Sequence, residues 1–182
     1  MASLTELGAI LHEEHFHIVV WICDLQNRTT GTAALQPLDP NCPDDKRQLE
    51  TLILGLDQVL VHHAFEETVL FPLVRDRGGS ELTMLLTDEH IAIEPIVARL
   101  QSVVRAILAR GPGNGLWSEC CAVSGELIAE MMAHLEKEEL GVVRQLDCLL
   151  DADTDHRLAV ERSDHKHMTQ HQFDRDLQPH LA

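Results

Sequence analysis

Apolar residues recur every three or four positions along four long segments of the chain, which is the spacing of one face of an α-helix. The segments cover residues 4–27, 45–75, 81–110 and 116–150. The breaks between them are rich in glycine, proline and small polar residues: TTGTAALQPLDPNCPDD, RGG and GPGNG. The pattern predicts an all-α protein, specifically an up-down-up-down four-helix bundle built from two helical hairpins.

Local signals mark some helix ends. Ser80 precedes the third periodic segment and is a candidate N-cap. Pro72 and Pro95 fall inside the second and third segments, so a kink is expected at each.

The 182 residues suffice for one domain with a tail. Residues 1–150 form the expected bundle, and residues 151–182 form a polar tail that holds five of the twelve histidines. With few apolar residues to bury, the tail is predicted to be a short helix or disordered. A solvated extension is favoured over a role in loading metal.

Charge and cysteine content narrow the class of protein. Thirty acidic residues against 14 basic ones give a net charge of −16, which disfavours nucleic acid and anionic membranes as partners. No stretch matches a signal peptide or a membrane span, so a cytoplasmic protein is expected. The five cysteines form no C-x-x-C pair and are expected to be reduced.

The chain contains an internal repeat. The segment LHEEHFHIVVWICDLQ (11–26) aligns with LTDEHIAIEPIVARLQ (86–101), and HHAFEE (62–67) aligns with HLEKEE (134–139). Helices one and two therefore resemble helices three and four. An antiparallel bundle made of two such hairpins has a pseudo-two-fold axis, around which the matched polar residues are expected to meet.

The spacing of the matched residues gives a candidate metal site. His134 and Glu138 lie four residues apart on one helix face. The second helix offers two equivalent choices, His62 with Glu66 or His63 with Glu67, and the repeat favours the first because His62 aligns with His134.

The first and third helices each add one histidine to this site. His15 and His90 lie on the same helix faces as the recurring apolar residues of their segments, with His12 as the alternative to His15.

Six inward ionisable groups need compensation, because burying lone charges costs several kcal/mol each. Two carboxylates shared between two ions, with two histidines on each ion, would form a dinuclear centre. Imidazole and carboxylate ligands without thiolate suit iron or manganese before calcium.

At these residues the chain resembles the hemerythrin-like, or HHE cation-binding, family of non-heme di-iron four-helix bundles. The pattern H…HxxxE…H…HxxxE stands here as His15, His62, Glu66, His90, His134 and Glu138, within the phrases EEHFHI, EETVLFP, DEHIAI and HLEKEE. The resemblance covers about residues 4–150.

The resemblance implies two iron ions, Fe²⁺ or Fe³⁺, bridged by Glu66, Glu138 and an oxo or hydroxo group, with the four histidines as terminal ligands. Manganese or zinc are possible substitutes. It also implies that the centre binds or reduces O2, NO or peroxide. A sensing or metal-buffering module without turnover is the alternative.

Residues near the site have less defined roles. Oxygen-carrying hemerythrins have a fifth histidine on the third helix, where this chain has Glu94, a possible additional ligand or hydrogen-bond partner. His12 is expected at the mouth of the site or behind a ligand. His17 and His63 are predicted to be surface or boundary residues. Glu67 and Glu139, which follow Glu66 and Glu138 in the chain, are predicted to be solvated neighbours of the site and not ligands.

Overall fold

The computed structural model describes the backbone of residues 4–113 and 115–176, with side chains up to residue 164. Every regular element in this part of the chain is helical, which confirms the all-α class. The long helices are α1 (Glu6–Thr29), α2 (Pro43–Phe65), α4 (Ser80–Arg110), α5 (Leu116–Gly141) and α7 (Ala152–Asp176). The short ones are η1 (Ala33–Leu35), η2 (Glu66–Leu70), α3 (Phe71–Asp76), η3 (Val143–Gln145) and α6 (Leu146–Leu149).

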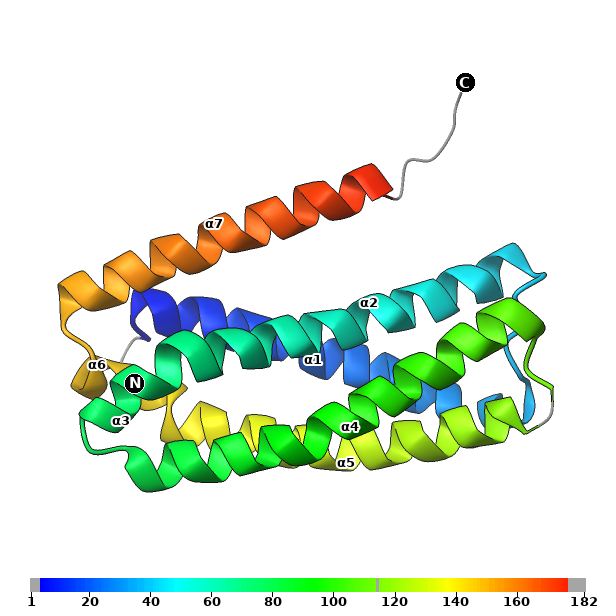
Figure 1. Cartoon of the computed structure of the whole chain (residues 1–182), viewed down its shortest axis with the longest axis horizontal. Coiled ribbons are helices and arrows are strands. Elements are labelled where there is room, and N and C mark those ends of the chain that lie inside the picture. The colour runs from blue at the N-terminus through cyan, green and yellow to red at the C-terminus, as the bar shows by residue number, and fades with distance from the viewer. Residues whose placement is uncertain (1–3, 114, 177–182) are drawn as a thin grey trace.

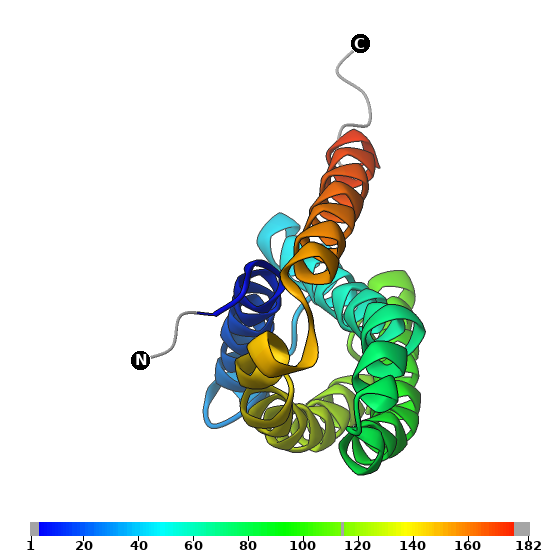
Figure 2. The same ribbon diagram turned by 90° about the vertical axis from the view of Figure 1, so that its left-hand side faces the viewer.

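The long helices α1, α2, α4 and α5 lie side by side, and each runs opposite to the one before it in the chain (Figure 1). Seen from the end, they surround a common interior (Figure 2). Helix α1 contacts α2 and α5, and α4 contacts the same two helices, so the four form a closed ring. Helix α7 lies outside this ring and packs on α1.

Two apolar clusters fill the interior, one on each side of a polar layer. The larger cluster includes Ile22, Leu56, Val104 and Leu127, and the smaller one includes Phe71 and its neighbours near the other end. Because an α-helix has 3.6 residues per turn, the spacing of the apolar residues places these side chains on the inward faces of the helices. The polar layer between the clusters is therefore shielded from water along the bundle axis.

The helix ends follow from short-range hydrogen bonds. The Thr5 hydroxyl accepts a hydrogen bond from the Gly8 N–H at 3.1 Å and caps α1. The prediction that Ser80 caps the third helix was wrong: the cap position is Gly79, and Ser80 is the first helical residue. Gly115 precedes α5 at a φ of 78°, a left-handed conformation that costs glycine little.

The helical run from α2 to α3 contains one wider turn. Residues 66–70 form the π-helical element η2, and Pro72 follows within the first turn of α3. Pro72 has no N–H to donate, so a local change in hydrogen bonding is expected here. The wider turn lies directly beside the polar layer. Pro95, by contrast, lies inside the unbroken helix α4.

The described part of the predicted tail is helical, and residues 177–182 lie outside the described residues. Helix α7 spans Ala152–Asp176, and its first turns bury Asp155, Leu158, Ala159 and Arg162. The Asp155 carboxylate accepts hydrogen bonds from the N–H groups of Glu6 and Leu7 at the start of α1. None of the described helices combines the length and apolar content needed to cross a lipid bilayer.

Candidate metal centre

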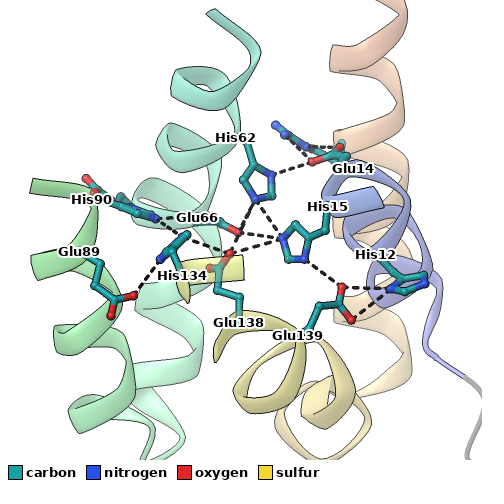
Figure 3. A network of polar contacts seen from close by, with 12 residues as sticks. His12, Glu14, His15, His62, Glu66, Glu89, His90, His134, Glu138 and Glu139 are labelled. Atoms are coloured by element: carbon teal, nitrogen blue, oxygen red, sulfur yellow. Dashed lines mark hydrogen bonds and ion pairs between the residues drawn. The ribbon is translucent and has the colours of Figure 1, made fainter. Parts of the chain in front are cut away.

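The polar layer brings together all six residues of the predicted ligand set. Each is 3% exposed or less, and their side chains converge from four helices (Figure 3). They are His15 on α1, His62 on α2, Glu66 at the start of η2, His90 on α4, and His134 and Glu138 on α5.

The donor atoms form two overlapping groups. One consists of His15, His62 and the two glutamates, and the other of His90, His134 and the same two glutamates. Within each group the donor atoms lie within 4.8 Å of one another. Both carboxylates thus belong to both groups, which is the arrangement that a pair of neighbouring ions requires.

Individual distances show how closely the donors approach. Along α2, His62 Nε2 lies 3.0 Å from Glu66 Oε1, and along α5, His134 Nε2 lies 3.4 Å from Glu138 Oε2. Both pairs use the four-residue spacing expected from the sequence. Across the helices, His15 Nε2 lies 3.4 Å from Glu138 Oε2.

Each of the four histidines in the candidate ligand set donates the hydrogen of its Nδ1 to a carboxylate at 2.9 or 3.0 Å. Each of these bonds joins neighbouring helical segments. The pairs are His15 with Glu139, His62 with Glu14, His90 with Glu67 and His134 with Glu89. Such bonds fix the tautomer and leave the Nε2 lone pair to bind metal. Three of these carboxylates are drawn in Figure 3 with labels: Glu14, Glu89 and Glu139.

Three of the four outer carboxylates have a further cationic or histidine partner. Arg162 of α7 donates two hydrogen bonds to Glu14, at 2.9 and 2.8 Å. Lys137 donates to Glu89 at 2.6 Å, and His12 contacts Glu139 at 3.0 Å. The Arg162 guanidinium also lies 4.4 Å from the centre of the Phe65 ring.

The unmatched charge of this network equals that of two divalent ions. Six carboxylates carry six negative charges, and Arg162 and Lys137 offset two of them. The carboxylates are Glu14, Glu66, Glu67, Glu89, Glu138 and Glu139. Four negative charges therefore have no lysine or arginine partner in the network, and those of Glu66 and Glu138 lie fully buried, where compensation is needed.

Lone-pair geometry also points to bound cations. His15 Nε2 lies 3.1 Å from His62 Nε2, and the same distance separates the Nε2 atoms of His90 and His134. Because each Nδ1 already donates, two lone pairs would face each other in each half of the site. Buried oxygens of Glu66 and Glu138 lack hydrogen-bond partners among the described residues. The residues present thus fit a pair of metal ions.

The pKa values of residues in the polar layer are also shifted in the directions that favour positive charge there. Burial alone would lower the pKa of His15, but the neighbouring carboxylates of Glu138 and Glu139 raise it to about 10. Burial alone would raise the pKa of Glu14, but His62 and Arg162 hold it well below its usual range. Without metal, His15, His62 and His134 therefore retain protons that bound ions would replace.

Several predictions about neighbouring residues need correction. His63 is fully buried, not a surface or boundary residue, and its ring stacks on His90 with the centroids 3.7 Å apart. Glu67 and Glu139 are not simply solvated, since each orients a ligand histidine. His17 is exposed, as expected.

The two possible additional ligands both lie outside the donor groups. Glu94 is exposed on α4, and the structure does not bring it to the site. The His12 side chain is 57% exposed and contacts the centre only through Glu139.

Part of this outer network was visible in the sequence. Glu14 and Glu89 match in the repeat, as do Glu67 and Glu139, so their common role follows the alignment. Arg162 has no counterpart in the repeat and gave no signal.

With the geometry established, comparison with known families gives the class of protein. Residues 8–146 match the Hemerythrin HHE cation binding domain. Since the match spans well over half of the chain, this protein belongs to the hemerythrin HHE cation-binding family. Comparisons with curated proteins and with solved structures gave no significant match. Helix α7 lies beyond the matched region, so its contacts with Glu14 are an addition to the family domain.

Proposed function

We propose that this chain is a non-heme di-iron protein that binds or reduces O2, NO or peroxide. The observation that carries the proposal is the sharing of Glu66 and Glu138 between two groups of buried donors. In this proposal the chain is an up-down-up-down four-helix bundle. Its four helical units are α1, then α2 together with its continuation α3, then α4, and finally α5, and each hairpin supplies half of the ligands. Bound iron would supply a reversible change of oxidation state and open coordination positions.

The protein's own residues would hold and insulate the centre. Glu66 and Glu138 would bridge the ions, and the four histidines would each bind through Nε2. The outer carboxylates keep the imidazole rings in orientation and increase their basicity. The apolar clusters on either side exclude water, which strengthens the electrostatic interactions inside the layer.

The donor set favours iron or manganese over calcium. Each ion would meet two imidazoles and two carboxylates and no thiolate. Calcium prefers an all-oxygen environment, and structural zinc favours four-coordinate sites that often contain cysteine. All five cysteines are free thiols, and Cys120, the most buried of them, lies within the larger apolar cluster.

A metal-buffering or sensing module is the second candidate function. The almost complete burial of all six ligands favours it, because slow exchange of ions suits storage. The cytoplasmic location expected from the sequence is part of both proposals.

The test is to express the protein with iron, measure its metal content, and mix the reduced protein rapidly with O2, NO and peroxide. About two irons per chain and a stable new absorbance band, or repeated consumption of peroxide, would support the main proposal. A single oxidation without turnover or ligand binding would support buffering. A protein that incorporates no iron would contradict both.

A further inference from the structure

His63 is a fifth histidine in the metal layer that the ligand set does not use. It follows His62 on α2 and is fully buried. Its ring stacks on His90 at an interplanar angle of 9°, and the His134 ring meets it edge-on with the centroids 5.4 Å apart. His63 therefore adjoins the half of the centre formed by His90 and His134.

Neither ring nitrogen of His63 has a hydrogen-bond partner among the described residues. The four ligand histidines differ, since each gives its Nδ1 hydrogen to a carboxylate. A buried polar group without a partner is costly, and native structures contain few of them. We therefore take the two nitrogens of His63 as evidence that a further group binds in the centre.

One donor atom of His63 lies within 4.8 Å of donor atoms of His90 and His134, so these three residues could also hold an ion, but the stacked arrangement argues against His63 as a metal ligand. Imidazole binds a metal through a lone pair that lies in the plane of its ring. The rings of His63 and His90 are nearly parallel with centroids 3.7 Å apart, so one ion cannot lie in both planes. Phe71 covers the His90 ring with centroids 5.5 Å apart, and this further fixes the orientation of His90.

The repeat shows that His63 is specific to one half of the centre. Aligning HHAFEE with HLEKEE places His63 opposite Leu135, which is 3% exposed and belongs to the larger apolar cluster. A leucine at the equivalent position can neither donate nor accept a hydrogen bond. At this pair of equivalent positions, the half with His90 and His134 therefore has a hydrogen-bonding group where the other half has a leucine.

We propose that His63 recognises a small anion, of the size and charge of hydroperoxide or azide, in the half of the centre formed by His90 and His134. The imidazole offers one N–H donor to the anion, and its stacking on His90 holds the ring in place. The inference rests on the proposed function, because it requires a loaded centre that admits small ligands.

The test measures azide binding to the iron-loaded protein by titration and by the infrared stretch of the azide. His63→Phe preserves an aromatic ring for stacking but has no hydrogen-bonding nitrogen. His63→Leu installs the residue that the other hairpin uses. Both are expected to keep about two irons per chain, to bind azide about 10- to 100-fold more weakly and to shift its stretch. His63→Gln, which retains an N–H donor, is expected to bind within a few-fold of the wild type.

The outcomes separate the inference from the proposed function. The exposed His17 on α1 supplies the matched control, and His17→Phe is expected to bind azide like the wild type. Unchanged azide binding by His63→Phe would overturn the inference, as would loss of one iron, since His63 would then be a ligand. If the iron-loaded wild type binds no azide, NO or peroxide, the proposed function itself fails.

Discussion

The two halves of the centre have the same inner residues but different surroundings. Each half has two histidines, each histidine has its own carboxylate, and Glu66 and Glu138 belong to the donor groups of both halves. On one side Glu14 is held by a buried arginine from α7, whereas on the other Glu89 is held by Lys137, whose side chain is 42% exposed. His63 stands where the other hairpin has Leu135. Two related hairpins thus supply equivalent ligands, while the surrounding residues make the two positions inequivalent.

The largest effect is expected from a substitution of Glu66. Because this residue belongs to the donor groups of both halves, its loss affects the two halves alike. Glu66→Ala removes a carboxylate from both donor groups, so the metal content is expected to fall from about two ions per chain to nearly none. Metal analysis of purified protein measures the change. Glu94→Ala on the exposed face of α4 is the control and is expected to keep its metal. Retention of both ions by Glu66→Ala would contradict the shared-carboxylate arrangement.

The next effect separates the halves by the burial of their ion pairs. Arg162→Met leaves Glu14 buried without its guanidinium, and the free energy of unfolding is expected to fall by about 3–5 kcal/mol. Lys137→Met removes a partly exposed cation from Glu89 and is expected to cost less than about 1 kcal/mol. Denaturant unfolding of the metal-free proteins measures both changes. Equal losses would show that the Arg162–Glu14 pair stabilises the fold no more than the Lys137–Glu89 pair does.

The smallest expected effect is a dependence of metal stabilisation on pH. The pKa of His15 is raised from 6.5 to about 10, so its proton stabilises the metal-free fold below pH 6.5 and is lost as the pH rises through about 10. Bound metal replaces this proton and is therefore favoured by higher pH. The increase in Tm on adding metal is expected to be larger at about pH 9 than at about pH 6.

Thermal melts with and without metal at both pH values check this expectation. Neighbouring carboxylates also raise the pKa of His62, well above its usual value, and that of His134, in each case against the effect of burial. Each half is thus expected to contribute to the pH dependence. Comparing His62→Ala with His134→Ala tests which half causes the pH dependence. A metal-induced increase in Tm that becomes smaller as the pH rises would contradict the replacement of protons by metal.

The sequence predicted those features that depend on short spacing or on the repeat. Helical periodicity located the four long helical runs, and the four-residue spacing of His62 with Glu66 placed both side chains on one face. The alignment of the two hairpins then selected His62 over His63 as the counterpart of His134. The structure brings these residues together with the other members of the predicted set.

Features that depend on neighbours distant in the chain could not be found this way. An apolar stripe marks one inward line on a helix, but α2 borders both α1 and α4, so His63 is buried although it lies off that line. Arg162 pairs with Glu14 across 148 residues, within a segment poor in apolar residues. Neither periodicity nor the repeat encodes such a contact.

The bond from Asp155 to the start of α1 links the first helix to the last, and this affects how the protein is made. A ribosome releases the N-terminal region first, so all six candidate ligands emerge before α7. Until α7 has emerged, the nascent chain has neither Asp155 to anchor α1 nor Arg162 to neutralise Glu14. Iron acquired during synthesis would thus enter a centre whose charge balance is still incomplete.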